Sequence, residues 1–407
     1  MFIKFFRYVI AVVLAIIIIS IVVINLKIHY QPEHIIERGN SVQYELVREL
    51  RGLKRALNEN ADVEMQKIYP EGYVFLNATY ALAWSSFLSH QGHQNYLEEG
   101  HTEISKAWDK INSETGKSHF TRNLPLPYGS FYNGWSSYVL ACKLRLEMAQ
   151  DRSDREILQF KQQCNKISDA LQQTTYPESY DGAAWPADVM VCVASLCLHD
   201  QLFEPQYKNV VRKWLPEVMK RLDNHGMIPH SVHPHNGMPD ENSRGSSMSL
   251  ILIFLHNIDN QFVQEQFLLF KESFVADLSG LTGILEYAKR NSGRGDIDSG
   301  PVFLGFGSAA TIVGMQTLSI FGAHESALKV RNAVEAFSLP VQREDYKHHF
   351  FGKLPIADAF ITWSHSGMKD EMHPPISFVA FHLFSLMIVA LLSLVFWIFF
   401  PKRSIPL

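Results

Sequence analysis

The sequence has no long run of basic residues, only four cysteines among 407 residues, and none of the short motifs that mark common nucleotide or ester chemistry. Its net charge is −4, which together with the missing basic runs argues against a nucleic acid partner. It contains no Gly-Lys-Ser/Thr phosphate loop, no Gly-x-Ser-x-Gly turn and no dinucleotide-binding fingerprint. These absences exclude the commonest nucleotide-binding and esterase functions.

The four cysteines, at positions 142, 164, 192 and 197, do not have the spacing of a metal site. Cys192 and Cys197 are expected on one apolar helix, about 140° apart around it, so they cannot bond to each other without breaking the helix. Cys142 and Cys164 flank an expected turn near Asp151, so a disulfide between them is geometrically possible. The alternative is that all four are small, buried core residues.

Two apolar segments, at about residues 5–26 and 376–400, are each long enough to cross a bilayer as a helix. The first lacks the short apolar region and small-residue cleavage site of a signal peptide, so we interpret it as an anchor. Basic residues lie outside both segments, which predicts that both chain ends are cytoplasmic. Those basic residues are Lys4, Arg7, Lys402 and Arg403.

This pattern divides the chain into three parts. Residues 1–28 hold a cytoplasmic tail and a transmembrane helix, residues 29–372 form an outward-facing domain, and residues 373–407 hold a second transmembrane helix and tail. In a bacterium the expected location is the inner membrane, with the main domain in the periplasm or otherwise outside the cytoplasm.

A unit of two helices repeats six times in the main domain. Each unit has a loop rich in Gly, Pro, Asp and aromatic residues, then an apolar helix, then a charged amphipathic one. The apolar helices are expected to begin near Tyr73, Phe131, Trp185, Ser246, Val302 and Ile356. The amphipathic helices are expected at 40–58, 95–111, 153–173, 205–222, 261–274 and 324–337.

Such a repeat predicts an all-α fold made of six helical hairpins. If the ring closes, the apolar helices line the inside of an (α/α)6 toroid and the amphipathic ones cover the outside. An open solenoid is the alternative, but it would leave apolar inner helices without a partner. We therefore expect the closed toroid, flanked by one transmembrane helix at each end.

Three loop sequences carry a resemblance to a known family: Tyr-Asp-Gly-Ala-Ala-Trp-Pro at 180–186, Asn-Ser-Arg-Gly-Ser-Ser at 242–247, and Gly-Asp-Ile-Asp-Ser-Gly-Pro at 295–301. Over roughly residues 60–365 the chain resembles the linalool dehydratase/isomerase-like domain family. The resemblance implies the toroid that this family shares with six-hairpin glycosidases and polysaccharide lyases. It also implies a chemistry that uses cysteines near the pocket, for which no cysteine here is an evident match.

In such a toroid the loops before the inner helices meet at one end, so their polar residues converge. Two carboxyl groups with tyrosine and tryptophan rings would suit a carbohydrate cleft. We predict Asp298 as one catalytic carboxyl, because it precedes the expected helix start at Pro301 and so lies near the positive end of a helix. Asp181 is the expected partner. The alternatives are that Asp298 shapes its turn and that Asp181 forms an Asx-type turn with Gly182.

Substrate contacts are expected from aromatic, charged and histidine residues in the same loops. Arg244 would hold a carboxylate or phosphate, as a uronic acid would supply, or else pair with Asp240 or Asp298. Asp296 is expected to be solvated or paired with Arg294. The spacing of four loop histidines, at 225, 230, 233 and 235, matches no standard ligand set, so no metal is expected. The predicted binding residues are Tyr73, Tyr132, Trp135, Tyr180, Trp185, Arg244, Asp296, His233 and His235.

Three functional hypotheses follow. The first is a membrane-anchored hydrolase or lyase that acts on an envelope or extracellular polysaccharide by carboxyl acid/base catalysis, with no cofactor. His233 or His235 could then be the base of a lyase. The second is a dehydratase/isomerase-like enzyme on an apolar alcohol, with a pocket walled by Phe303, Phe306, Met315 and Met190. The third is a non-catalytic toroid for binding or assembly.

Overall fold

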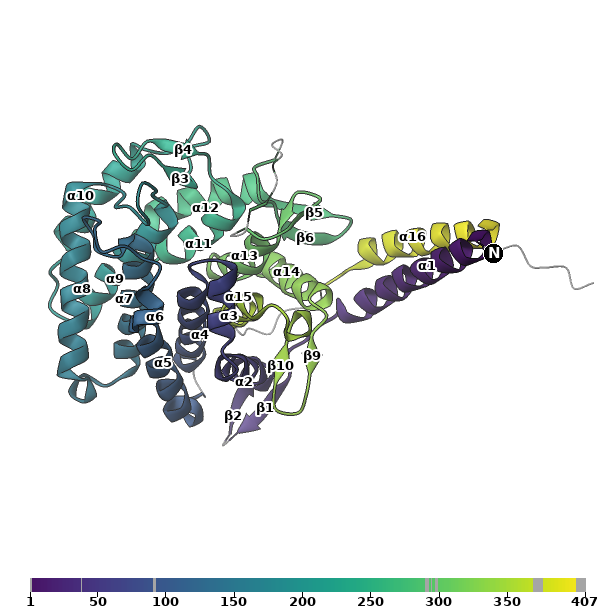
Figure 1. Cartoon of the computed structure of the whole chain (residues 1–407), viewed down its shortest axis with the longest axis horizontal. Coiled ribbons are helices and arrows are strands. Elements are labelled where there is room, and N and C mark those ends of the chain that lie inside the picture. The colour runs from purple at the N-terminus through teal and green to yellow at the C-terminus, as the bar shows by residue number, and fades with distance from the viewer. Residues whose placement is uncertain are drawn as a thin grey trace, which may run out of the picture.

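The inner helices form a closed ring. The computed structural model describes residues 2–37, 39–90, 93–289, 293, 295–296, 299–368 and 376–399. Each inner helix packs against the next, and the last packs against the first, which confirms the (α/α)6 toroid (Figure 1). In ring order they are α4 (Gly72–Ser89), α7 (Gly129–Leu146), α9 (Pro186–Leu202), α11 (Gly245–Leu255), α13 (Ser308–Ile320) and α15 (Pro355–Ser366).

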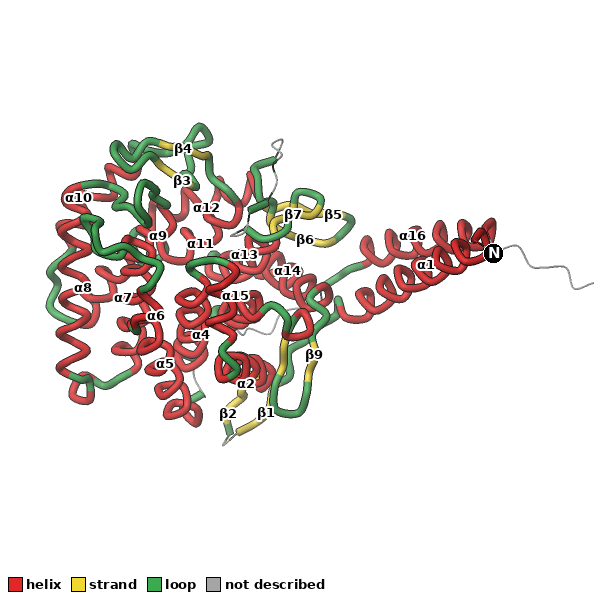
Figure 2. The backbone as a smooth tube through the Cα atoms, viewed as in Figure 1, coloured by secondary structure: helices red, strands yellow, loops and turns green. Residues whose placement is uncertain are grey.

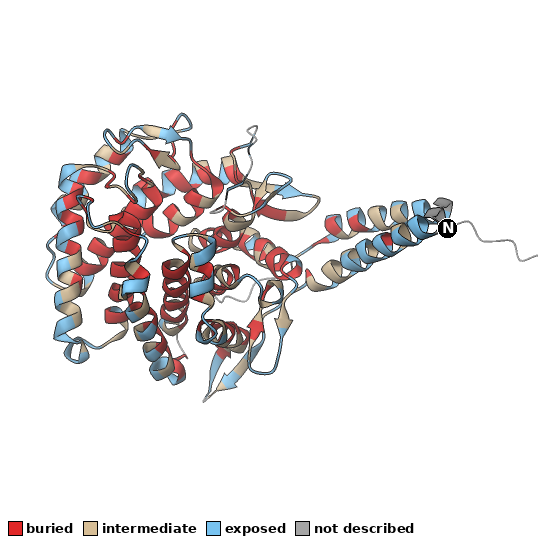
Figure 3. Ribbon diagram, viewed as in Figure 1, coloured by how far each residue is buried: buried red, intermediate tan, exposed pale blue. Residues whose placement is uncertain are grey.

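The outer helices cover this ring. Each has an apolar face towards the inner helices and a charged face towards solvent, as in α2, where Leu46, Leu50 and Leu53 are buried. The inner helices are instead buried on all sides; in α7 every residue from Gly129 to Leu144 is buried (Figure 3). The outer helices are α2 (Tyr44–Asn58), α5 (Leu97–Asn112), α8 (Asp154–Gln173), α10 (Lys208–Met219), α12 (Asn260–Phe274) and α14 (His324–Phe337).

Small residues let neighbouring inner helices approach closely. A Cβ atom on Gly134 of α7 would lie 3.0 Å from the carbonyl oxygen of Asp188 in α9. The hydroxyls of Ser137 and Ser195 bridge the same pair of helices at 3.0 Å. The contact between α7 and α9 therefore depends on residues without bulky side chains.

Apart from one long helix at each end of the chain, the remaining elements are short. The described residues include two further α-helices, α3 (Ala61–Ile68) and α6 (Glu114–Lys117), and three 3-10 segments, η1 (Gln94–Tyr96), η2 (Ala149–Asp151) and η3 (Phe350–Gly352). Five antiparallel strand pairs lie in the loops (Figure 2). They are β1 (His34–Glu37) with β2 (Asn40–Gln43), β3 (Ser231–Val232) with β4 (Pro239–Glu241), β5 (Val275–Leu278) with β6 (Leu281–Ile284), β7 (Val302–Phe303) with β8 (Phe306–Gly307), and β9 (Val341–Gln342) with β10 (Lys347–His348).

Two predicted helix starts are wrong. The helix expected at 40–58 begins at Tyr44, because Asn40–Gln43 pair with β1 as strand β2. Five inner helices begin within two residues of the expected position, but α13 begins at Ser308 and not at Val302. The intervening residues form the β7–β8 hairpin, whose turn places Leu304 at φ 52° and Gly305 at φ 87°. The segment therefore reverses direction before the helix starts, and the residues around Gly300 do not cap it.

Two long apolar helices, α1 (Phe2–Lys27) and α16 (Val379–Phe399), leave the toroid together and lie side by side (Figure 1). By length and composition both could cross a membrane. The free ends of both helices lie at the tip that is remote from the toroid. At the near end Ile28 is fully buried, and its carbonyl oxygen accepts a hydrogen bond of 2.9 Å from Asn332 Nδ2 of α14.

Candidate functional site

The loops before the inner helices are joined to each other at one end of the toroid, which we call the mouth. Backbone hydrogen bonds link the loop before α7 to that before α9, from Ser130 N–H to the Glu178 carbonyl, 2.8 Å. Val232 donates to the Ala184 carbonyl at 3.1 Å, and Gly245 to the Glu286 carbonyl at 2.8 Å. Polar residues from sequence-distant loops are thus held together at the mouth.

Arg244 is the centre of a charged cluster at the mouth. It lies in extended conformation just before α11 and is 9% exposed. Its guanidinium pairs with Glu241 and with Asp296, while its Nε has no hydrogen-bond partner among the described residues. Asp240, one of the expected partners, does not pair with Arg244 and lies near His233 instead. The other expected partners, Asp298 for Arg244 and Arg294 for Asp296, lie outside the described residues.

The pKa of Asp296 is lowered by its hydrogen bonds. Partial burial acts to raise it, but the Ser299 backbone N–H, 2.9 Å away, and the Arg244 guanidinium outweigh this and lower the pKa to about 2. Asp296 is therefore ionised at neutral pH.

A second carboxyl at the mouth has its pKa shifted in the opposite direction, upwards. Glu286 lies two residues after the end of β6 and is fully buried. Burial raises the pKa of its carboxyl to about 7. Its Oε1 accepts a hydrogen bond of 2.7 Å from Ser246 Oγ, and its Oε2 has no partner among the described residues. A Cβ atom on residue 307 would lie 2.5 Å from Oε2, so glycine at that position leaves room for the carboxyl.

Sequence reasoning missed Glu286. It belongs to no motif, and the segment before it, Leu281–Ile284, has the sequence of an ordinary buried strand. The available signal was a single acid at the end of an apolar strand, in a loop expected to face the mouth.

One histidine lies near this cluster, and it is not one of those predicted. Burial and the neighbouring Arg244 lower the pKa of His230 to about 4, so its ring is neutral at physiological pH. His233 is exposed and lies 3.4 Å from Asp240, which is also exposed. His235 is exposed too. The two predicted histidines therefore lie on the surface of the loop.

Of the two predicted catalytic residues, Asp298 lies outside the described residues. Asp181 is exposed in the tight turn between Tyr180 and Ala183, where Gly182 has φ 75°. The Gly182 N–H donates to Glu178 Oε1 at 2.9 Å, so Glu178 supports this turn. No described contact joins Asp181 to the Arg244 cluster.

The predicted aromatic residues separate into two groups. Trp135 is fully buried inside the ring, in edge contact with Phe75, Phe254 and Trp363. Tyr73 and Tyr132 are 6% and 3% exposed, and the Tyr132 hydroxyl donates to Asn112 Oδ1 at 3.0 Å. Tyr180 and Trp185 are partly exposed and contact each other edge to face. These last two remain able to contact a ligand at the mouth.

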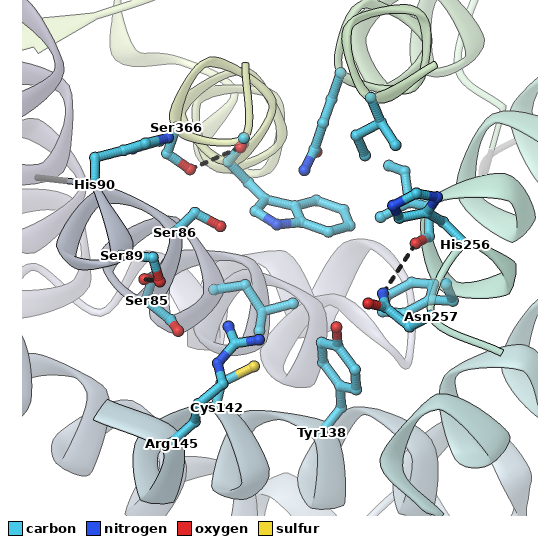
Figure 4. A pocket seen from close by; sticks show the side chains of 17 residues that line it. Ser85, Ser86, Ser89, His90, Tyr138, Cys142, Arg145, His256, Asn257 and Ser366 are labelled. Atoms are coloured by element: carbon cyan, nitrogen blue, oxygen red, sulfur yellow. Dashed lines mark hydrogen bonds between the residues drawn. The ribbon is translucent and has the colours of Figure 1, made fainter. Parts of the chain in front are cut away.

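The wall expected for an apolar pocket is not formed. Phe303 is 76% exposed in the β7–β8 hairpin, while Met190 and Met315 are fully buried in helix packing. A cavity of about 250 Å³ lies instead at the opposite end of the toroid, where the inner helices end. Polar side chains, among them those of Arg145, Tyr138 and Cys142, reach into it (Figure 4).

The four cysteines are free thiols. The possible disulfide between Cys142 and Cys164 is therefore not formed. Burial raises the pKa of the Cys142 and Cys164 thiols, which keeps both protonated at neutral pH.

A second charged cluster, the Lys347 cluster, is buried between α2, α14 and β10. The Lys347 ammonium lies 2.7 Å from Glu45, 3.0 Å from Glu49 and 2.6 Å from Glu335. Ligand atoms of Glu49, Glu335 and His365 lie within 4.8 Å of one another, a spacing compatible with a metal ion. The Lys347 ammonium already pairs with Glu49 and Glu335, two of these three groups.

Comparisons with known proteins bear on the architecture. No protein-family model matches the chain, and no curated protein matches it. Membership of the linalool dehydratase/isomerase-like family therefore stays a prediction.

Two solved structures are similar in fold, and both are carbohydrate-active enzymes. A family 105 glycoside hydrolase of C. acetobutylicum has 8% identity and a TM-score of 0.48, over 79% of this chain and 99% of that one. An unsaturated glucuronyl hydrolase of Bacillus sp. GL1 has 9% identity and a TM-score of 0.42, over 86% of this chain and 94% of that one. At such low identity the likeness says nothing of activity.

Proposed function

We propose that this chain is a membrane-anchored, outward-facing enzyme that hydrolyses or eliminates a polysaccharide at the mouth of the toroid. The supporting observation is the pair Glu286 and Asp296, whose pKa values of about 7 and about 2 hold them in different protonation states near neutral pH. Acid/base chemistry on a glycosidic bond needs one carboxyl that carries a proton and one that has lost it.

The roles follow from the environments. Glu286 would donate its proton to the leaving glycosidic oxygen, and an ionised carboxylate would activate water or remove a ring proton. Asp296 can be that carboxylate, or it can orient the loop that carries Asp298, two residues further on. Because Glu286 is fully buried, the loops around it have to move before a substrate can reach it.

The Arg244 cluster favours a substrate with an acidic group. A substrate carboxylate can replace Glu241 or Asp296 on the Arg244 guanidinium, whose planar fork binds carboxylates in bidentate fashion. Tyr180 and Trp185 offer partly exposed rings in the adjoining loop. We therefore propose a uronate-containing polysaccharide of the cell envelope or its surroundings.

The membrane part of the proposal rests on α1 and α16. Because these helices lie side by side with their free ends at the same tip, both tails fall on one side of a membrane that they cross. The basic residues near both tails favour the cytoplasmic side. Reporter fusions at residue 1 and after residue 407 that are active only in the periplasm would contradict this orientation.

The proposed reaction can be tested by incubation of the purified full chain with a panel of polysaccharides, some with uronate units and some neutral. Product masses distinguish hydrolysis, which adds water, from elimination, which leaves an unsaturated end. Glu286→Gln should lower product formation at least about a hundredfold, the usual effect of losing a general acid. Glu325→Gln, at an exposed position on α14, is the matched control. Products that form equally with Glu286→Gln would refute the assignment of Glu286.

A second candidate function is recognition without catalysis. The observation in its favour is that Trp135, Tyr132 and Tyr73 are buried, so that the toroid is partly filled by its own side chains at the mouth. Saturable binding of a polysaccharide in the same panel, with no product at any pH, would support this candidate over an enzyme.

A further inference from the structure

The cavity at the end of the toroid opposite the mouth is a site in its own right. Five of the six inner helices contribute to its wall near their C-terminal ends. Its volume of about 250 Å³ corresponds to roughly eight water molecules in the liquid, enough for one monosaccharide-sized molecule. The Arg244 cluster contributes no residue to it, so its role is independent of the function proposed for the mouth.

The lining of this cavity has a distinct charge. It includes the guanidinium of Arg145, and no aspartate or glutamate occurs among the described residues that line it. Arg145 has no ion pair or hydrogen bond to any residue that the structure describes. In Figure 4 its guanidinium points into the cavity, on the same side as Cys142 and Ser85. Arg145 is exposed, so the cavity opens to solvent beside its guanidinium. A cation that lacks a protein partner and lines a cavity without carboxylates favours an anionic ligand.

The position of Arg145 in α7 has a simpler explanation as well, because a cation in the last turn of a helix is stabilised by the helix dipole. That effect does not explain a neutral polar group nearby. Gln316 Oε1 is buried, lines the cavity, and has no hydrogen-bond partner in the described part of the chain. Buried polar atoms are normally paired, so an unpaired amide oxygen in the wall of a cavity points to a missing partner.

The structure around Gln316 fixes its amide in place. A Cβ atom on residue 367 would lie 2.0 Å from Gln316 Nε2, so Gly367 permits the amide to lie flat against the end of α15. Burial raises the pKa of Tyr138, which keeps its hydroxyl protonated and able to donate. Trp363 and Phe254 add an apolar surface to the wall.

We propose that this cavity binds a small hydroxylated anion of the size of one sugar unit. Its carboxylate or phosphate pairs with Arg145, its hydroxyls bond to Gln316 and Ser85, and its apolar face lies against Trp363 or Phe254. Carboxylate and phosphate share the chemistry that the guanidinium recognises, so both are tested.

Calorimetric titration of the purified full chain with four probes tests the proposal. The probes are D-glucuronate, D-glucose 6-phosphate, inorganic phosphate and neutral D-glucose. One or both anionic sugars should bind, more tightly than inorganic phosphate and at least about tenfold more tightly than glucose. Binding by glucuronate alone or by the phosphate ester alone would identify the anionic group.

Two variants locate the site. Arg145→Gln removes the charge and should weaken binding of the anionic sugar by about tenfold to a hundredfold, as expected for loss of a charged hydrogen bond. Arg155→Gln, at an exposed arginine on α8, is the matched control and should bind like the native chain. The proposal is overturned if no probe binds, if glucose binds as tightly as the anionic sugars, or if Arg145→Gln leaves the affinity unchanged.

Discussion

Replacement of Lys347 by methionine should destabilise the toroid strongly, because the Lys347 cluster would retain three buried carboxylates without their shared ammonium. Lys347, Glu45, Glu49 and Glu335 are all less than 6% exposed. Removal of one partner from a buried ion pair costs about 3–5 kcal/mol, because it leaves uncompensated charge in a medium of low dielectric constant. We expect a loss of that order in the free energy of unfolding.

The loss can be expressed as a melting temperature. A domain of roughly 340 residues has an unfolding entropy of about 0.7 kcal/mol/K, so a loss of 3–5 kcal/mol lowers the Tm by about 4–7 °C. Differential scanning fluorimetry of the detergent-solubilised chain at a fixed scan rate would measure this shift.

Lys54→Met is the matched control for this prediction. The Lys54 ammonium also contacts two carboxylates, those of Glu99 at 3.0 Å and Glu103 at 3.2 Å, but its side chain is 32% exposed. Pairs with this exposure contribute at most about 1 kcal/mol, so the Tm should fall by about 1 °C. If Lys347→Met and Lys54→Met lower the Tm equally at neutral pH, the reasoning about buried charge is refuted.

Three further predictions concern other parts of the structure. Burial raises the pKa of Glu286 to about 7, above its unfolded value, so the folded state binds the extra proton and stability should fall as the pH rises from about 5 to 8. Glu286→Gln should flatten this fall in a pH series of Tm values, and an unchanged slope would contradict the shifted pKa. All four cysteines are free, so a thiol reagent should titrate four groups after denaturation without reductant, and two or fewer would indicate a disulfide. Asn332→Leu leaves the Ile28 carbonyl without its buried partner and should lower the Tm by about 1–4 °C, whereas no change would show that this bond does not hold the end of α1 against α14.

The helices of the toroid could be predicted because their signals are local. An apolar stripe such as Leu46, Leu50 and Leu53 in α2 recurs at the helical period, and the loops before the inner helices carry glycine and proline close to where those helices begin. The start of α13 could not be predicted, because Val302 and Phe303 are as compatible with an apolar helix as with the short strand they form. The hairpin depends on a left-handed conformation at Leu304, which nothing in that residue type signals.

The charged clusters could not be predicted for a different reason. Glu45 and Lys347 are 302 residues apart, and no local pattern relates them. Arg244 was expected near acids, but its partner Asp296 is set by the path of the loop and not by spacing. Sequence patterns therefore locate the mouth, whereas the protonation states of its carboxyls emerge only from the packed structure.

The joining of the last hairpin to the first also imposes an order on the assembly of the chain. The contacts that close the ring, hold the end of α1 against α14 and join α1 to α16 link residues 302 to 357 positions apart, from Lys347–Glu45 to His382–Asn25. At about 5–20 residues per second, a ribosome needs about 15–60 seconds to make the chain between Glu45 and Lys347. Until then α4 lacks its neighbour α15, and a buried wall of the finished ring remains open. The first inner helix therefore keeps an unpaired apolar face until nearly the whole toroid has been synthesised.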